Sequence, residues 1–349
     1  MRMVIDYRKL NKNIIKNSYP LPNIEDVINQ LGGAEYFSLC DLRSGFWQIG
    51  IDEADRHKTA FICHKGLFEF NRMPFGLTVA PSVYQNTMNE VLSDLIGNCI
   101  MVYIDDVIIY SKNLEDHWRH LEMVFERLNK AGMRLKPSKC HFLKKEVLYL
   151  GHIITTEGSY PDPEKVKVIY QLEPPKTVRE VRAFLGMTGF YRRYIKQFSE
   201  IARPLTQLTK KNTRFAWSTE AQEAFEILKE CLTQAPILAY PDVSRSYKLY
   251  TDASNYAIGG ILTQENESGE HVIQYLSHKL TAGQQKWPVI EKEAYAIVYA
   301  IRKLRPYLYG AKFTVYTDHK PLKSLFTAEM NNTRIQRWAI LIKDRKSVV

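Results

Sequence analysis

Hydrophobic residues recur at helical spacing through much of the first 160 residues, with strand-like segments between them. The spacing predicts helices over 22–31, over 81–96 and around His117 to Gly132. Apolar runs predict strands in three places: a strand ending near Asp41, a hairpin over 99–111, and further strands within 133–154.

Proline-rich breaks separate this region from the rest of the chain. Pro161–Pro163 and Pro174-Pro175 flank a mostly helical region that extends to about residue 234, and Pro236 and Pro241 follow it. The pattern then changes to two strands, a long helix and one more strand, predicted over 247–252, 257–263, 288–304 and 313–318. We therefore expect a new domain to begin near residue 242.

Two adjacent carboxylates occupy the turn of the predicted hairpin. Asp105 and Asp106 lie between the apolar runs IMVYI and VIIY, where they repel each other and lose hydration. A divalent cation would reverse that penalty, but an ordinary surface turn also accepts two aspartates. Asp41, at a strand end before a turn that contains Gly45, would supply a third ligand. Carboxylates that bridge two Mg²⁺ ions suit in-line phosphoryl transfer.

A second acidic set lies in the last third of the chain. Asp252 belongs to the strand-like segment YKLYTDAS, and Asp318 follows FTVYT. On the helix between them, Glu293 shares the stripe that faces the core, whereas Glu291 points elsewhere. A carboxylate on a buried stripe needs a partner. That partner is either a metal ion shared with the two aspartates or a basic side chain at the edge of the stripe.

Composition narrows the classes of protein and partner. The chain has 349 residues and a formal net charge of +10, which favours a polyanionic partner. It has no apolar run of about 18 residues and no signal-peptide core, so we expect neither a membrane span nor secretion. The five cysteines form no CxxC pair, and no P-loop or GxGxxG motif occurs. These absences disfavour zinc sites, disulfide frameworks and dinucleotide enzymes.

Ordered motifs along the chain resemble a known family. Between residues 4 and 152, the motifs VIDYRKLN, FSLCDLRSGFWQI, KTAF, MPFGL, YIDD and YLGH resemble the reverse transcriptase of Gypsy-type long-terminal-repeat retrotransposons. Later motifs resemble the RNase H domain that follows the reverse transcriptase in this family: YTDAS, EKEAYAIVYAI, YLYGAKFTVYTDHKPL and the late Arg337-Trp338. YIDD alone would be a weak signal, but the ordered set is specific and covers nearly the whole chain.

The resemblance implies an α+β fold, with a right-hand polymerase followed by an RNase H-like α/β domain. The expected boundaries are 1–160 for fingers and palm, 161–241 for the thumb and 242–349 for the RNase H-like domain. It implies an RNA-directed DNA polymerase that adds dNTPs to a DNA primer on an RNA template, and a ribonuclease H for RNA–DNA hybrids. The parent Pol polyprotein would also contain protease and integrase domains. The expected location is the cytoplasm, in virus-like particles, or the nucleus.

The resemblance also assigns roles to individual residues. It makes both acidic sets ligands of Mg²⁺, two ions per site with Mn²⁺ as a substitute: Asp41, Asp105 and Asp106 for the polymerase, and Asp252, Glu293 and Asp318 for the RNase H. The implied substrate-binding residues are Arg2, Phe46, Gln48, Pro74, Phe75 and Gly76. Arg2 would contact the incoming triphosphate, and the Phe46 ring would block a ribose 2′-hydroxyl.

The motif YRRY at residues 191–194 has two interpretations. It resembles part of the thumb, which would follow the duplex through its phosphates. It is equally typical of an amphipathic helix that buries two tyrosines in a core.

Two features depart from the family pattern. The family's fingers begin upstream of residue 1 with a triphosphate-binding lysine, so we expect truncated fingers. The family's RNase H takes a fourth carboxylate downstream of Arg337-Trp338, for which Asp344 is a poor positional match, so we expect an incomplete ribonuclease H. The alternative function is a catalytically inactive relic that binds nucleic acid through its basic surface. A structural subunit of a longer partner is a third.

Overall fold

The computed structural model describes residues 5–15, 19–322, 334, 336–338 and 340. The chain divides into two compact units, Met1–Thr156 and Glu157–Val349. The helical region 161–241 and the domain after it thus form one unit. Their separation into thumb and RNase H-like domain stays a prediction.

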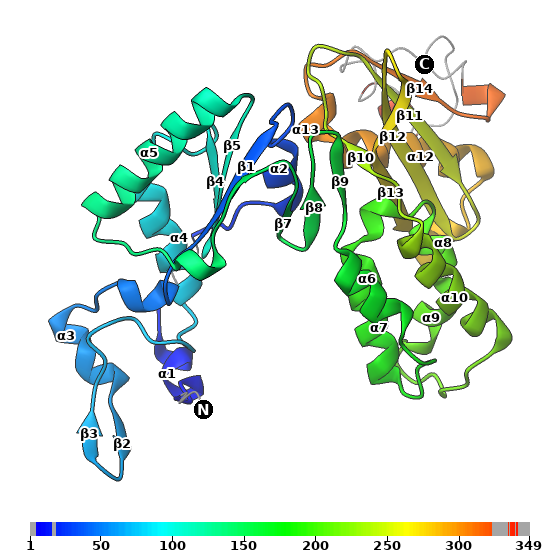
Figure 1. The fold of residues 1–349 in the computed structure, drawn as a ribbon. Helices are drawn as coiled ribbons and strands as arrows, with labels where there is room; N and C mark the ends of the chain where they lie inside the picture. Colours follow the sequence, from blue (N-terminus) through cyan, green and yellow to red (C-terminus); the bar gives the residue numbers. More distant parts are fainter. Residues whose placement is uncertain (1–4, 16–18, 323–333, 335, 339, 341–349) are drawn as a thin grey trace. The chain divides into compact units, whose positions relative to one another are not determined.

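The first unit is built on an antiparallel sheet with the strand order β4-β5-β1-β6. Its strands are β1 (Tyr36–Asp41), β4 (Ile100–Tyr103), β5 (Asp106–Ser111) and β6 (His141–Lys144). Two long helices, α4 (Ala80–Val91) and α5 (Leu114–Lys130), pack their apolar sides on the sheet (Figure 1). The Asn113 side chain accepts a hydrogen bond from the Asp116 backbone N–H, which fixes where α5 begins.

Shorter elements complete the first unit. They are α1 (Arg8–Asn13), α2 (Ile24–Asn29), η1 (Gly45–Gln48), α3 (Glu53–Arg56), η2 (His57–Thr59), β2 (Phe61–Cys63), β3 (Gly66–Phe68), η3 (Pro137–Lys139), β7 (Val147–Tyr149) and β8 (His152–Ile154). β2 and β3 form a hairpin apart from the main sheet, as do β7 and β8. The β2–β3 hairpin exposes its apolar residues, and Ile62 is 81% accessible.

The second unit combines a helical bundle with a second sheet. Its helices are α6 (Pro163–Tyr170), α7 (Val178–Phe190), η4 (Arg192–Tyr194), α8 (Phe198–Ile201), α9 (Arg203–Leu208), α10 (Thr219–Thr233), α11 (Ala282–Gln285), α12 (Val289–Lys303) and α13 (Arg305–Leu308). Its strands are β9 (Gly158–Pro161), β10 (Leu238–Ala239), β11 (Tyr247–Ala253), β12 (Ala257–Asn266), β13 (Gly269–Lys279) and β14 (Phe313–Tyr316). None of the described helices combines the length and apolar character needed to cross a bilayer.

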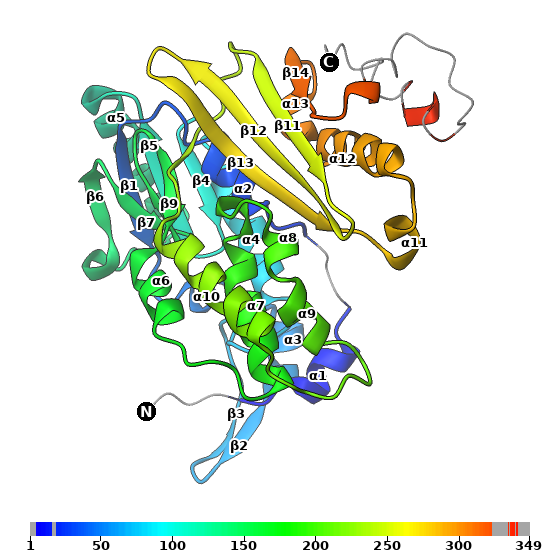
Figure 2. The same cartoon turned by 90° about the vertical axis from the view of Figure 1, so that its right-hand side faces the viewer.

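The sheet of the second unit has the strand order β13-β12-β11-β14. The helix α12 packs against it, with Ile297 and Ile301 in a common core with Leu249 and Leu262 of the sheet. Figure 2 shows β11, β12 and β13 of this sheet in yellow and β14 in orange, with the green helices α7 to α10 grouped beside the sheet. β14 runs parallel to β11, while the other neighbours are antiparallel. The mixed α+β class expected from the sequence is confirmed.

The structure also corrects some predicted boundaries. The helix predicted over 81–96 ends at Val91, and the strand predicted over 313–318 ends at Tyr316. β13 is absent from the predictions because it is an edge strand whose residues do not alternate cleanly between apolar and polar. Val272 and Tyr275 of β13 pack against the core of the helical bundle, so their burial depends on residues distant in sequence.

Candidate functional site

Three aspartates meet at one end of the first sheet. Asp41 is the last residue of β1 and Asp106 the first of β5, and the two are directly opposed in the antiparallel register. Directly opposed residues project from the same face of a sheet, so their side chains are neighbours. Asp105 lies in the turn before β5, after Ile104, whose φ of 52° is in the left-handed region. The structure thus brings the three aspartates that the sequence singled out to the same end of the sheet, although their ligand oxygens do not all lie within 4.8 Å of one another.

This cluster is crowded and electrostatically strained. A Cβ at Gly45 would overlap the Asp105 carboxylate, so only glycine fits there. Burial, with the charges of Asp106 and Asp41, raises the pKa of Asp105 to about 6. Asp105 Oδ1 is buried and has no hydrogen-bond partner in the described part of the chain. An unpartnered buried carboxylate oxygen fits a bound cation, which would supply the missing contact.

A cavity of about 580 Å³ opens beside these aspartates. Acidic, basic and aromatic side chains line it: Asp41, Asp105, Arg43, Lys136, Lys139, Trp47 and Phe75. Lys139 Nζ lies 2.9 Å from Asp41 Oδ2 and forms an ion pair with it. The cavity can therefore attract a polyanion through its cations and contact a planar or sugar group through its rings.

The second acidic set converges through strand register. Tyr250 of β11 pairs in parallel with Tyr316 of β14, and Asp252 and Asp318 each follow two residues later. Both aspartates therefore reach the same edge of the sheet, and Glu293 approaches from α12. Each of the three offers one ligand oxygen, and these oxygens lie within 4.8 Å of one another. Among the described residues, this set alone satisfies that ligand geometry.

Glu293 has the environment expected of a ligand. It is 4% exposed, and its Oε2 atom has no hydrogen-bond partner among the residues described. Burial, then the charges of Asp318 and Asp252, raise its pKa to about 7. The sequence left open that a basic side chain pairs with Glu293. A basic residue, Arg334, does lie nearby, but it pairs with Glu291: Arg334 Nη1 lies 2.5 Å from Glu291 Oε2. The expectation that Glu291 points elsewhere was therefore incomplete, because it too is buried.

Comparison with known protein families identifies the family to which the chain belongs. Residues 1–154 match the family "Reverse transcriptase (RNA-dependent DNA polymerase)", and residues 242–344 match the "RNase H-like domain found in reverse transcriptase". The chain belongs to the reverse transcriptases of Gypsy-type retrotransposons. The resemblance seen in the sequence motifs and the fold class that it implied are both confirmed.

Similar proteins include the retrovirus-related Pol polyproteins of the Drosophila melanogaster transposons 297 and gypsy. The transposon 297 polyprotein is 42% identical, and the match covers 98% of this chain and 32% of the polyprotein. The gypsy polyprotein is 39% identical, and the match covers 100% of this chain and 34% of the polyprotein. The Tf2-3 polyprotein of Schizosaccharomyces pombe is 34% identical, and the match covers 99% of this chain and 26% of the polyprotein. The reverse transcriptase chain therefore spans about a third or less of the polyproteins compared.

The fold is similar to that of a solved viral enzyme. The foamy viral protease-reverse transcriptase in complex with dsDNA has a TM-score of 0.86 and 27% identity, over 99% of this chain and 74% of its own. The same viral protein in complex with an RNA/DNA hybrid gives a TM-score of 0.79, over 99% and 48%.

The aromatic residues of this reverse transcriptase that were assigned to the substrate lie in two layers. Phe75 lines the cavity, and the Phe46 ring packs behind it at 5.3 Å between centroids. Phe46 also contacts the buried Tyr84 ring edge-on at 5.5 Å. Trp47, which the sequence reasoning did not single out, lines the cavity and contacts Phe75. The structure brings the pair Phe46 and Phe75 together, with Phe75 nearer the open space.

The Gln48 side-chain amide makes its hydrogen bonds to backbone groups. Its Nε2 donates to the carbonyl oxygens of Arg43 and Arg134, and its Oε1 accepts from the Arg134 N–H at 2.7 Å. Gln48 thus joins the turn after β1 to the segment before η3, and residues of both segments, among them Arg43 and Lys136, line the cavity. Its expected contact with nucleotide or template stays a prediction.

Pro74 and Gly76 flank Phe75 in the sequence but are not among the residues that line the cavity. Pro74 is buried, and Gly76 has a φ of 97°, which favours glycine. The Gly76 carbonyl accepts a hydrogen bond from Asn11 Nδ2 at 2.8 Å. Arg2 and Asp344 lie outside the described residues, so their expected roles stay predictions.

The YRRY motif is mainly a core element. Tyr191 and Tyr194 are both 2% exposed, and even Arg193 is 3% exposed. The interpretation as two core tyrosines is therefore supported, and of the motif's two arginines only Arg192 is exposed. Arg192 Nη2 donates to the carbonyl oxygen of Ser277 on β13, so this residue too makes an internal contact.

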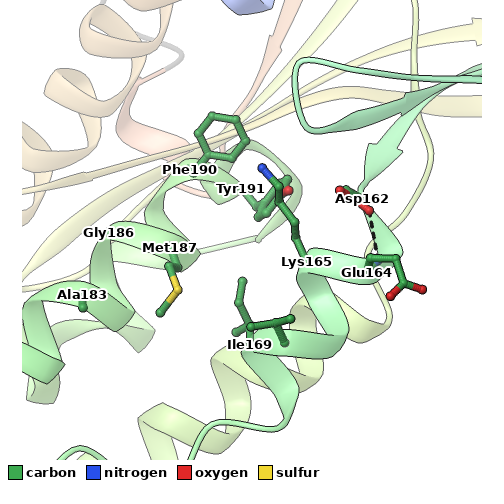
Figure 3. A pocket seen from close by; sticks show the side chains of 10 residues that line it. Asp162, Glu164, Lys165, Ile169, Ala183, Gly186, Met187, Phe190 and Tyr191 are labelled. Atoms are coloured by element: carbon green, nitrogen blue, oxygen red, sulfur yellow. Dashed lines mark hydrogen bonds between the residues drawn. The ribbon is translucent and has the colours of Figure 1, made fainter. Parts of the chain in front are cut away.

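The bundle of the second unit contains an apolar cavity of about 720 Å³ between α6 and α7. Ile169, Met187 and Phe190 face it, as Figure 3 shows, and the polar residues lie at its rim. Asp162 there caps α6 by accepting from the Glu164 N–H. The lining of this cavity is therefore mainly apolar, without a cluster of three carboxylates like those of the two acidic sites.

Proposed function

We propose that this chain is the RNA-directed DNA polymerase segment of a retrotransposon Pol polyprotein, with a ribonuclease H-like domain attached. The proposal rests on one observation above all. Asp41, Asp105 and Asp106 converge beside a cavity with basic and aromatic walls, and Asp105 Oδ1 is left without a partner. The complexes of the similar viral enzyme with dsDNA and an RNA/DNA hybrid support a template and primer as ligands here too.

The three palm aspartates would hold divalent cations, of which Mg²⁺ is the proposed species and Mn²⁺ a substitute. Two such ions would activate the primer 3′-hydroxyl and neutralise the triphosphate leaving group. The chain's own part is to fix the carboxylates, through the strand pairing of Asp41 with Asp106 and the tight packing of Asp105 on Gly45. Lys139 holds Asp41 in one orientation through their ion pair.

We propose that the cavity receives the incoming dNTP. Arg43, Lys136 and Lys139 supply positive charge for the phosphates, and Trp47 and Phe75 supply apolar walls for the sugar and base. Because Phe46 supports Phe75 from behind, the two rings together would set the room beside the sugar. Phe46→Ala should therefore raise ribonucleotide incorporation, and an unchanged preference for deoxynucleotides would remove Phe46 from this role.

For the second unit we propose divalent-metal binding by Asp252, Glu293 and Asp318, with hydrolysis of the RNA strand of a hybrid as the reaction. The close approach of the three ligand oxygens and the unpartnered Glu293 Oε2 support it. These residues would orient the scissile phosphate. Glu293, held on the buried face of α12, would set how far from the sheet the metal ion binds.

The polymerase proposal is tested with a primed RNA template, dNTPs and Mg²⁺. Asp105→Asn should lower primer extension on the order of a thousandfold while duplex binding is retained, because it removes a ligand charge at nearly constant volume. Asp94→Asn is the matched control, since Asp94 forms a surface ion pair with Arg127. Salt-sensitive binding without extension by the wild-type chain would instead support the inactive, nucleic-acid-binding relic.

A further inference from the structure

The end of β11, which carries Asp252, and the turn 254–256 that follows it are contacted by the helical bundle of the same unit. The segment 192–203 packs on strands β12 and β13 through η4 and α8. Polar contacts join it to the sheet: the Ser199 N–H donates to Ser277 Oγ at 2.9 Å, and Ser254 Oγ donates to Glu200 Oε2 at 2.7 Å. The Arg203 guanidinium lies 3.1 Å from the centre of the Tyr256 ring.

One of these contacts reaches an acidic residue of the proposed metal site directly. Gln197 Nε2 donates a hydrogen bond to Asp252 Oδ2 at 3.2 Å. Gln197 holds a left-handed backbone with a φ of 54°, which glutamine rarely adopts. Opposite Asp252 in the register lies Gly259, where a Cβ would come within 3.9 Å of Gln197 Cγ. Gln197 thus packs beside Gly259 at ordinary contact distance, and its left-handed backbone accompanies the hydrogen bond.

The hydrogen bond has a specific consequence for a metal ligand. Asp252 is exposed, so without a partner its carboxylate would rotate among several orientations, which must be lost when a metal binds. A donor on one oxygen fixes the carboxylate plane and leaves the other oxygen available. A neutral amide does this without the competing positive charge that a lysine would bring.

We propose that Gln197 is a positioning residue for Asp252, so that the helical bundle helps to order the metal site of the RNase H-like domain. This inference rests on the proposed function of that site. The turn 254–256 is also held from α12, where Lys292 Nζ donates to Asn255 Oδ1 at 2.8 Å. Of these contacts to the end of β11 and the turn after it, the hydrogen bond from Gln197 is the one made to the proposed metal ligand itself.

The test measures Mn²⁺ binding by electron paramagnetic resonance in the full chain carrying Asp105→Asn, so that the signal reports on the second unit. Gln197→Met keeps the side-chain length without the donor and should weaken Mn²⁺ binding on the order of tenfold. Gln197→Asn should weaken it similarly, because its amide is one methylene too short, although asparagine tolerates the left-handed backbone. Gln207→Met, at an exposed position on α9, is the matched control.

Each result decides the matter. Weaker binding by both Gln197 variants, with the melting temperature and the Gln207 control unchanged, supports the positioning role. Unchanged binding in either variant overturns it, and tighter binding would mean that the amide competes with the metal. If the chain with Gln197 intact binds no Mn²⁺, the proposed metal site itself fails. That outcome is distinct from a failure of the positioning role alone.

Discussion

Asp41 in the first unit has the Lys139 ammonium 2.9 Å from its Oδ2, whereas Asp252 in the second has the neutral Gln197 amide at 3.2 Å. Both sites crowd three carboxylates at a sheet edge, and each leaves one buried oxygen unpartnered, on Asp105 and on Glu293. The palm thus offsets part of its negative charge with a fixed cation. In both sites, burial and neighbouring carboxylates raise the pKa of one carboxyl group, that of Asp105 to about 6 and that of Glu293 to about 7.

The two sites therefore share a raised carboxyl pKa and differ in the partner of one aspartate, a lysine for Asp41 and an amide for Asp252. A lysine stabilises the carboxylates but must yield to the cation, since both bind the same oxygens. A raised pKa stabilises them through a proton, which makes metal binding depend on pH. The following changes should separate the two sites, beginning with the largest expected effect.

The largest effect is expected from removing one ligand at a time. Glu293→Gln should abolish any cleavage of the RNA strand of a hybrid, on the order of a thousandfold, and leave primer extension within about twofold. Asp105→Asn should do the reverse, because each change removes charge from one site only. Parallel assays of extension and hybrid cleavage on one labelled substrate would measure both, and a loss of both activities by either variant would contradict two independent sites.

The second effect concerns the stability of the metal-free second unit. The folded pKa of Glu293, about 7, lies above its unfolded value, so its contribution to stability is complete below about pH 4.5 and is lost as pH rises through 7. The loss amounts to about 3 kcal/mol at most. Calorimetry in EDTA from pH 5 to 8 should show it, and Mg²⁺ should reverse it. Glu267→Gln, an exposed control, should retain this dependence, and its persistence in Glu293→Gln would contradict the assignment.

The first unit should respond to pH in the opposite direction through His117. This histidine is fully buried between Ser38 Oγ at 2.7 Å and Ser111 Oγ at 2.8 Å, and burial lowers its pKa to about 4. Its contribution is present above pH 6.5 and is lost as pH falls toward 4, a change of about 3 kcal/mol. His117→Gln should flatten the acid limb of the unfolding curve. The same change at the exposed His64 should leave that limb intact.

The smallest effect is expected at the ion pair of the palm. Lys139→Met should tighten Mn²⁺ binding there by about threefold, because the ion pair of a solvent-exposed lysine is weak. The measurement uses the Glu293→Gln background, so that binding reports on the first unit. Lys145→Met, which breaks a surface pair with Glu35, is the control. Weaker binding in Lys139→Met would mean that Lys139 supports the ligands more than it competes.

Short-range pattern was sufficient for most elements and for the acidic residues. The stripe His117, Leu121, Val124 and Leu128 predicted α5, and all four side chains are buried. The pair Asp105 and Asp106 between two apolar runs predicted the β4–β5 turn, because a hairpin is specified by neighbouring residues. The weaker predictions concern residues whose surroundings come from elsewhere, such as Arg193 in YRRY, which is buried.

By itself, therefore, the sequence determined most of the long elements, the two acidic sets and the family, since these depend on local spacing and ordered motifs. Only the tertiary structure decided which partner each carboxylate has. Lys139 is 98 residues from Asp41, and Gln197 is 55 residues from Asp252. The physical reason is that periodicity reports which face of an element is buried, whereas a contact between side chains distant in sequence depends on how the elements pack.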